Sequence, residues 1–168
     1  MTRKSLENIA LHYLERYSSS ADRLRQVLMR RVERSVYRHG TDRATAEAWV
    51  AEVVAHLAGR GYLDDARYAE ARILTLRRQG RSGRAIRAEL LSRGVSSEDV
   101  ARAVAATENT GEPGQDEMEA AFVLARRRKL GPYRPAEQRA SWRMKDLAVL
   151  ARAGFSIEIA RHVIDAEV

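Results

Sequence analysis

Two stretches of this chain repeat one pattern, and the repeat limits the folds that the chain can adopt. Residues 90–104 read LLSRGVSSEDVARAV, and residues 150–163 read LARAGFSIEIARHV. Each contains the end of a helix, a glycine, an apolar residue, a serine and a new helix that carries an Ala-Arg pair. Glycine commonly ends a helix, and a serine oxygen commonly caps the next one. The distance between the copies fits three short helices with their connections, so we expect successive three-helix units.

Apolar residues recur at steps of three and four along nearly the whole chain, which is the pattern of amphipathic helices. One clear stripe consists of Ala46, Trp49, Val50, Val53, Val54 and Leu57. No stretch alternates apolar and polar residues between hairpin turns, so no sheet is expected. We therefore predict an all-α fold in which three tandem three-helix repeats form an elongated, curved array.

The repeat and the breaks in periodicity predict where each unit begins and ends. The expected repeats are residues 5–60, 62–107 and 115–167, and a linker is expected at 108–114. Residues 107–117 read TENTGEPGQDE, which contains Gly-Glu-Pro-Gly and no apolar stripe. Such a segment is typical of a connection between helical units.

The charge of the chain indicates a polyanionic partner. The formal net charge is +7, and only Lys4, Lys129 and Lys145 are lysines, so arginine supplies nearly all positive charge. Arginine suits bidentate contacts to phosphate or carboxylate. The partner would be a nucleic acid or an acidic protein surface. The alternative is that the basic residues only interact with solvent and bind no partner.

Several classes of protein are excluded by what the sequence lacks. It has no cysteine, so disulfides and thiolate chemistry are absent. No apolar run is long enough to span a membrane, and the N-terminus lacks the apolar core of a signal peptide, so we expect a cytoplasmic protein. No phosphate-binding loop, dinucleotide fingerprint or metalloprotease motif is present. The four histidines are isolated and predict no metal site. We expect no enzyme activity, no cofactor and no metal.

Residues 60–70 read RGYLDDARYAE and contain two adjacent acids, Asp64 and Asp65. Paired carboxylates can be catalytic, can hold a metal or can start a helix. Neighbouring residues on a helix point about 100° apart, so these two carboxylates would not converge on one atom. Acids also stabilise the first turn of a helix, and this favours the capping role. The flanking Tyr62 and Tyr68 are expected to pack at the helix junction.

Two clusters of basic residues are candidates for binding an anion. From Arg72 to Arg93 the chain has seven arginines against one acid, Glu89, and a second cluster lies at 126–129. The segment RRQGRSGR, 77–84, joins two predicted helices, so backbone N–H groups could assist the arginines. The alternative is a solvated face. The candidate residues are Arg72, Arg77, Arg78, Arg81, Arg84, Arg87, Arg126, Arg127, Arg128 and Lys129.

These motifs resemble the RecX family, which regulates the RecA recombinase. The strongest match is GYLDDARYAEA, 61–71, followed by RRQGRSGRAIRAELLSRGV, 77–95. Supporting matches are ALHYLERYSSSADRLRQVL, 10–28, and LARAGFSIEIARHVID, 150–165. The resemblance runs over most of the chain. Within the first motif, the residues assigned to helix start and packing are Gly61, Tyr62, Leu63, Asp64, Asp65 and Tyr68.

The resemblance implies three tandem three-helix repeats and a regulator without enzyme activity. It also implies binding to RecA filaments on single-stranded DNA, with inhibition of strand exchange, ATP hydrolysis and coprotease activity. Some relatives contact DNA themselves, and we expect a monomer. The role of the arginines is inferred from charge and not from the resemblance.

Two alternatives belong to other classes. The turn at Gly94 could belong to a helix-turn-helix transcription factor, whose recognition helix should offer Arg, Asn or Gln to base edges. The helix after Ser97 carries only Arg102 as a basic residue, which disfavours this reading. The other alternative is a scaffold that binds proteins only, and its binding would be insensitive to salt.

Overall fold

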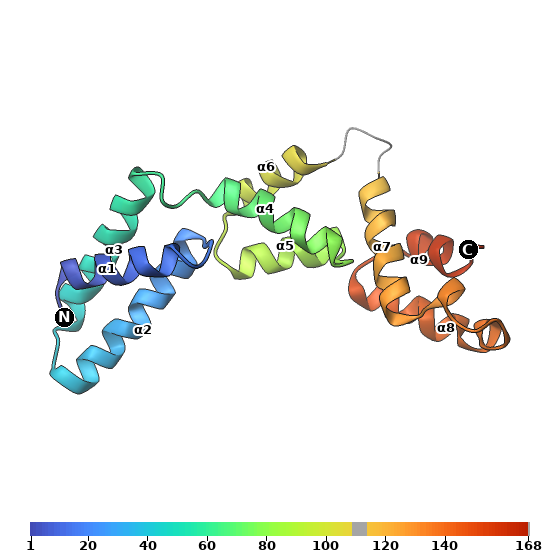
Figure 1. Ribbon diagram of the computed structural model, residues 1–168, viewed down its shortest axis with the longest axis horizontal. Helices are drawn as coiled ribbons and strands as arrows, with labels where there is room; N and C mark the ends of the chain where they lie inside the picture. Colours follow the sequence, from blue (N-terminus) through green and yellow to red (C-terminus); the bar gives the residue numbers. More distant parts are fainter. Residues whose placement is uncertain (109–113, 168) are drawn as a thin grey trace. The chain divides into compact units, whose positions relative to one another are not determined.

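A computed structural model describes residues 1–108 and 114–167 of the protein (Figure 1). These residues form nine α-helices, one short 3-10 helix and no strand, which confirms the predicted all-α fold. Residues 109–113 of the expected linker lie outside the described residues. In chain order the elements are α1 (Arg3–Leu14), α2 (Ala21–His39), α3 (Arg43–Gly59), α4 (Asp65–Arg78), α5 (Gly83–Ser92), α6 (Ser97–Thr107), α7 (Gln115–Arg128), η1 (Gly131–Tyr133), α8 (Ala136–Ala153) and α9 (Ile157–Ile164).

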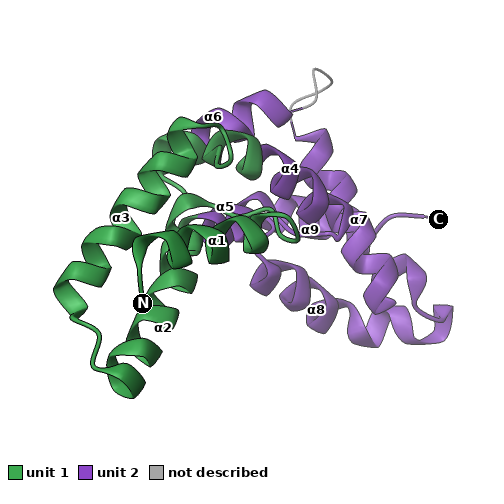
Figure 2. Ribbon diagram, turned by 60° about the vertical axis from the view of Figure 1, so that its left-hand side comes forward, with its two compact units in different colours: residues 1–69, 91–100 green, residues 70–90, 101–168 purple. Residues whose placement is uncertain are grey.

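The helices belong to two compact units (Figure 2). Unit 1 contains residues 1–69 and 91–100, and unit 2 contains residues 70–90 and 101–168. The helices also follow one another as three triplets, α1–α3, α4–α6 and α7–α9. The middle triplet, α4–α6, is divided between the two units. The compact units therefore do not coincide with the expected repeats.

The core of unit 1 lies between α1, α2 and α3. Leu24, Leu28 and Val32 follow one another at steps of four along α2 and are fully buried, as the apolar stripes predict. The facing stripe of α3 contains Val50, Val53 and Leu57. The complete set of buried residues in this core is Leu6, Ala10, Leu24, Leu28, Val32, Ala46, Val50, Val53, Leu57 and Leu63.

The last triplet forms a core of its own in unit 2. Alanines on α7 leave room for α9 to pack closely, because Ala121 and Ala125 are fully buried and one turn apart. The complete set of buried residues in this core is Ala120, Ala121, Ala125, Leu130, Leu147, Leu150, Phe155, Ala160, Val163 and Ile164.

A buried carboxylate fixes η1 against α8 in the same core. Asp146 is 2% exposed, and one of its oxygens accepts hydrogen bonds from Gly131 N at 2.9 Å and from Arg134 Nε at 3.1 Å. Its other oxygen accepts from Arg134 Nη2 at 2.8 Å. A buried charge with partners of this kind is tolerated, whereas removal of one partner leaves the other charge unpaired.

We predict that Asp146→Ala lowers the free energy of unfolding by about 3 kcal/mol, because it leaves Arg134 and the Gly131 N–H without their acceptor. Urea unfolding followed by circular dichroism measures the change. The matched control is Asp165→Ala, which removes an equally close but exposed partner from Arg143. The control should change stability little. If both variants lose the same free energy of unfolding, burial does not determine how much Asp146 contributes to stability.

Candidate anion-binding groove

Unit 1 contains a contact in which one serine hydroxyl serves two helix ends. Ser20, the fully buried N-cap of α2, accepts a hydrogen bond from Arg23 N at 3.2 Å and donates to the Arg93 carbonyl at 2.5 Å. That carbonyl lies just after the end of α5 and just before Gly94. The neighbouring Ala21 N–H donates to Asp65 Oδ1 at 2.8 Å. The start of α2 is thereby attached to the end of α5 and to the start of α4.

Unit 2 contains the same contact with other residues. Ser82, also fully buried, accepts from Ala85 N at 3.2 Å and donates to the Ala153 carbonyl at 2.6 Å, just before Gly154. The neighbouring Gly83 N–H donates to the Glu117 carboxylate at 2.9 Å and 3.1 Å. The start of α5 is thereby attached to the end of α8 and to the first turn of α7.

We call these contacts the serine joints; the first consists of Ser20, Ala21, Asp65, Arg93 and Gly94, and the second of Ser82, Gly83, Glu117, Ala153 and Gly154. In both joints, a serine caps the second helix of its triplet and donates a hydrogen bond to the end of the second helix of the next triplet. Ser20 thus connects α2 to α5, and Ser82 connects α5 to α8. The first N–H groups and last C=O groups of helices lack partners within the helix. Each joint supplies partners to both kinds of end. The joints explain part of the sequence repeat between residues 90–104 and 150–163, because Gly94 belongs to the first joint and Gly154 to the second.

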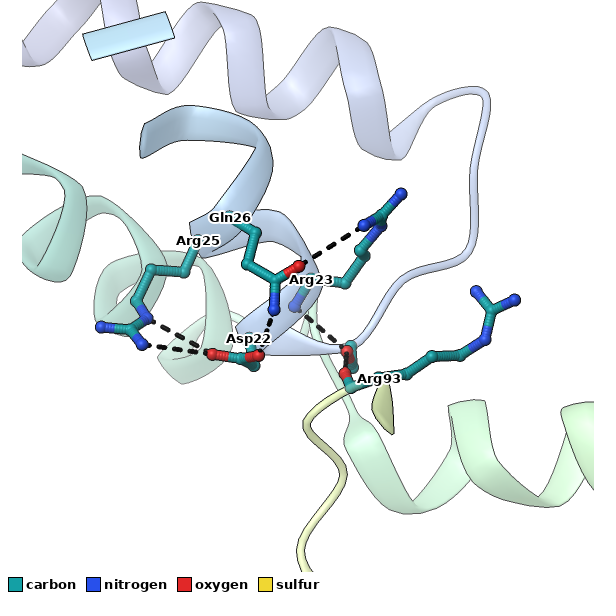
Figure 3. Close-up of polar contacts among 6 residues, drawn as sticks. Asp22, Arg23, Arg25, Gln26 and Arg93 are labelled. Carbon is teal, nitrogen blue, oxygen red and sulfur yellow. Dashed lines mark hydrogen bonds and ion pairs between the residues drawn. The ribbon is translucent and has the colours of Figure 1, made fainter. Parts of the chain in front are cut away.

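The glycines are required at the joints by conformation and by space. Gly94 and Gly154 have φ values of +77° and +103°, which L-residues with side chains rarely adopt. A Cβ on Gly94 would lie 2.3 Å from the Cβ of Asp22, a residue close to Arg93 in Figure 3. A Cβ on Gly154 would lie 2.4 Å from Ser82 Oγ. A side chain at either position would therefore displace its joint.

The adjacent acids of the GYLDD motif have separate structural roles. Asp64 Oδ1 accepts a hydrogen bond from Arg67 N at 2.9 Å, as a helix cap does, whereas Asp65 belongs to the first serine joint. Tyr68 is buried at 9% exposure, but Tyr62 is 57% exposed. Tyr62 therefore does not fit the expected packing role, because more than half of its surface is exposed to solvent.

The environment of Asp65 changes its titration. Burial raises the pKa of Asp65 above its ordinary value of 3.8, and the hydrogen bond from the Ala21 N–H opposes this shift. The carboxylates of Asp99, Asp64 and Asp22 raise the pKa further. The raised pKa means that ionised Asp65 is less favourable in the folded protein than in the unfolded chain.

An open groove of about 710 Å³ lies in unit 2 beside the second serine joint. Its walls come from α4, the turn after α4, α5, α7 and α8. One acid, Glu89, lies among its lining residues, together with five arginines. These are Arg72, Arg81, Arg127, Arg128 and Arg152.

A glycine lets the two basic clusters meet in this groove. Gly80 has a φ of +76°, and a Cβ there would lie 2.7 Å from the backbone nitrogen of Leu124 in α7. The close approach is reinforced by Arg127, whose Nη1 donates to the Gln79 carbonyl at 2.6 Å. The turn after α4 is therefore in direct contact with α7, and arginines separated by more than 40 residues in sequence line one groove.

The single acid of the groove does not balance its positive charge. Arg72 donates to Glu89 Oε1 from Nε at 3.0 Å and from Nη2 at 2.6 Å, and Arg81 Nη2 lies 3.8 Å from Glu89 Oε2. Arg152 donates from Nε to the Ala148 carbonyl at 3.2 Å. Within residues 1–108 and 114–167, the structure shows no hydrogen bond or ion pair for Arg128. The groove can therefore accept a carboxylate or phosphate, because guanidinium groups bind either in bidentate fashion.

The predicted basic candidates divide into different surroundings. Four of them, Arg72, Arg81, Arg127 and Arg128, line the groove. Arg77, Arg84 and Arg87 line a second cavity that also contains three acids, and Arg78 lines a third cavity with acids nearby. The acids of the second cavity are Glu108, Asp116 and Glu117, and those of the third are Glu70, Glu108, Asp116 and Glu119.

Arg77 and the two remaining candidates, Arg126 and Lys129, have structural contacts or positions of their own. Arg77 Nη1 lies 2.5 Å from Glu117 Oε2 and is 20% exposed, so this arginine supports the acid of the second serine joint. The Arg126 guanidinium lies over the Tyr133 ring, 5.4 Å from its centroid. Lys129 follows α7 with a φ of +54° and is exposed.

Arg152 is a groove residue that the sequence analysis missed. It lies on α8, well outside both basic clusters, and reaches the groove because the second serine joint holds the end of α8 there. In the sequence repeat it lies two residues before Gly154. The equivalent position in the other copy is Ser92, so the repeat alone did not mark a basic residue.

The helices, their arrangement as successive triplets and the two serine joints define a class: an all-helical protein with repeated helix triplets. The profile described as "RecX, second three-helix domain" matches residues 64–104. The chain is 47% identical over 161 residues to "Regulatory protein RecX" of Myxococcus xanthus (strain DK1622), which covers 95% of this chain and 84% of the relative. The chain belongs to the RecX family.

Two further comparisons agree with this family. "Regulatory protein RecX" of Agrobacterium fabrum (strain C58 / ATCC 33970) is 32% identical over 157 residues, with 94% of this chain and 80% of the relative covered. A crystal structure of RecX from Lactobacillus salivarius superposes with a TM-score of 0.67 at 20% identity and covers 96% of this chain and 94% of that one. At this identity the structural match shows the fold alone.

The family confirms the resemblance found in the sequence. Its members are regulatory proteins and not enzymes, which agrees with the predicted absence of enzyme activity. In the described part of the chain, no helix combines the length and the apolar character needed to cross a membrane.

We predict that Ser82→Ala lowers the free energy of unfolding by about 2 kcal/mol, because it removes a helix cap and the buried hydrogen bond to Ala153 together. The matched control is Ser96→Ala. Ser96 also caps a helix, through Asp99 N at 3.0 Å, but in an exposed position. The control should cost about 1 kcal/mol. Urea unfolding measures both, and equal losses would show that the joint adds nothing to the cap.

We predict that Asp65→Asn preserves or raises stability at neutral pH. Because the folded-state pKa is raised, the contribution of Asp65 is most favourable at low pH and is lost as pH rises through that pKa. The neutral amide can still accept from the Ala21 N–H. Urea unfolding between about pH 4 and about pH 7 measures this effect. The free energy of unfolding of the variant, relative to that of the wild type, should increase as pH rises.

Asp65→Ala is the control for this prediction, because it removes the acceptor as well as the charge. It should be less stable than Asp65→Asn at every pH. A loss of stability at neutral pH that is as large for Asn as for Ala would show that the carboxylate charge is needed at the joint.

Proposed function

We propose that this protein binds RecA filaments on single-stranded DNA and lowers their recombinase, ATPase and coprotease activities. The observation that carries the proposal is the 47% identity to a RecX regulatory protein over 95% of the chain. A RecA partner also implies action in the cytoplasm. The chemistry of unit 2 supports a binding role, because the groove offers arginines without a nucleophile or metal-ligand cluster among its lining residues.

The groove is the surface that we assign to an anionic part of the filament. Arg128 has no internal partner among the described residues, and Arg152 uses one of its donors on α8. Each can therefore donate to an external phosphate or carboxylate. Such contacts position a partner without reading base sequence. A regulator that binds one filament state more tightly than another shifts the filament toward that state.

The alternative of a helix-turn-helix transcription factor gains no support. The candidate recognition helix, α6, carries two acids in its first turn and Arg102 as its only basic residue. A recognition helix needs donors for base edges near its N-terminus. Acids at that end would instead repel the nearby phosphates.

The direct test adds the purified protein to RecA, ATP and single-stranded DNA. At amounts stoichiometric with RecA, ATP hydrolysis should fall, and filaments seen by electron microscopy should become shorter. Unchanged ATP hydrolysis together with unchanged filament length would exclude the proposal.

The groove assignment has a separate test in the same assay. We predict that the double variant Arg128→Gln, Arg152→Gln inhibits RecA about tenfold less well, because it removes two cations from the anion site. The matched control is Arg16→Gln, Arg60→Gln, which removes the same charge from exposed positions of unit 1. Both variants should unfold like the wild type. Full inhibition by the folded groove variant would remove the assignment.

Arg77 is unsuitable for this test although it belongs to the predicted basic cluster. Its pairing with Glu117 makes it part of the second serine joint. Loss of inhibition after Arg77→Ala would therefore report on the stability of unit 2 as well as on binding.

A further inference from the structure

Helix α2 in unit 1 carries a positive charge that its own acids balance only in part. Its 19 residues, Ala21–His39, include six arginines and two acids, a formal charge of +4. The whole chain has +7. One helix therefore holds more than half of the net positive charge of the protein.

The two acids of α2 already have partners. Asp22, in the first turn, accepts from Arg25 Nη2 at 3.3 Å and from Gln26 Nε2 at 2.8 Å (Figure 3). Glu33 lies 3.9 Å from Arg43, a residue of α3. Among the described residues, neither carboxylate forms a hydrogen bond or ion pair with the arginines in the second half of α2, so the charge there is not balanced locally.

The second half of α2 carries four exposed arginines: Arg30, Arg31, Arg34 and Arg38. Within the described residues, the structure shows no hydrogen bond or ion pair for any of them. Arg30, Arg34 and Arg38 follow one another at steps of four and form a row of about 12 Å along the helix. Like charges at this spacing destabilise a helix. Among the described residues, no contact of these arginines offsets the repulsion between them. An external polyanion would reduce it.

An unpacked aromatic ring lies beside the arginine row. Tyr37 is 92% exposed, more than any other large hydrophobic residue of the structure, and the described residues show no ring contact for it. It is three residues from Arg34 and seven from Arg30, which places the three side chains on one side of the helix. The core of unit 1 lies elsewhere on α2, because its buried positions are Leu24, Leu28, Val32 and Ser35.

We propose that the outer face of α2 is a binding site for single-stranded nucleic acid, in which Arg30, Arg34 and Arg38 contact phosphates and a base stacks on Tyr37. We call these four residues the α2 stripe. A basic row combined with an accessible aromatic ring is the chemistry that binds single strands without sequence preference. In a duplex the base faces are already stacked, and an acidic protein surface would use the arginines but not the ring face.

The α2 stripe is independent of the role proposed for the groove. It lies in unit 1, it shares no residue with the groove, and its binding needs no RecA. An assay without RecA therefore separates the two proposals. Failure to bind a free single strand would not contradict the filament proposal, and failure to inhibit RecA would not contradict the α2 stripe.

The test measures fluorescence anisotropy of a labelled oligo(dT) with the full-length protein over a range of salt concentrations. The stripe variant is Arg30→Gln, Arg34→Gln, Arg38→Gln. It should bind at least about tenfold more weakly at low salt, and the slope of log affinity against log salt should fall by about 2, since each single-strand phosphate contact contributes about 0.7. The substituted side chains are exposed, so thermal unfolding should be unchanged.

The matched control is Arg16→Gln, Arg60→Gln, Arg67→Gln, three exposed arginines of unit 1 outside α2. It removes the same charge and should keep most of the affinity and slope. If control and stripe variants lose affinity equally, only net charge matters and the site is wrong. If the stripe variant binds like the wild type, the face serves another partner and the proposal is also wrong.

Tyr37 distinguishes a single strand from other polyanions. Tyr37→Ala should weaken binding about tenfold, whereas Tyr37→Phe, which retains the ring, should bind like the wild type. Unlabelled duplex DNA of equal length should compete less well than the single strand. Wild-type affinity after Tyr37→Ala, or equal competition by the duplex, would overturn the assignment to single strands.

Discussion

The architecture depends on a serine hydroxyl that caps one helix while it donates to a backbone carbonyl at the end of another. Helix ends carry backbone groups without partners inside the helix, and burial of such groups is unfavourable. Ser20 and Ser82 each satisfy both kinds of group with one side chain, in the same geometry and in different units. The groove in unit 2 follows from the second contact, because Ser82 holds the end of α8, and with it Arg152, beside the turn after α4.

The two serine joints have similar hydrogen bonds and different electrostatics. At the second, Glu117 accepts from the Gly83 N–H and also has the Arg77 guanidinium as a counter-charge. At the first, Asp65 accepts from the Ala21 N–H but is surrounded by other carboxylates, and burial raises its pKa. An arginine in a basic cluster therefore need not be available to an external partner. Arg77 shows how local charge density can overstate the size of a site.

Sequence reasoning succeeded where the signal was local. The helical periodicity, the capping role of Asp64 and the glycines at 94 and 154 depend on neighbours within a few residues. It failed where the signal was tertiary: the pairing of Arg77 with Glu117 joins residues 40 positions apart, and Arg152 enters the groove only through the fold. The boundaries of the repeats and the curvature of the array stay predictions.

The two basic surfaces differ in chemistry, and this difference bears on the kind of partner. The groove combines arginines from several helices and contains no aromatic residue, so it suits a carboxylate or a phosphate. The α2 stripe comes from one helix and adds an exposed tyrosine ring, so it suits a chain of phosphates with accessible bases. A filament of protein on single-stranded DNA offers acidic protein groups, phosphates and unpaired bases together. If both proposed roles hold, such a filament would match the chemistry of both surfaces, whereas a duplex or an acidic protein would match each only in part.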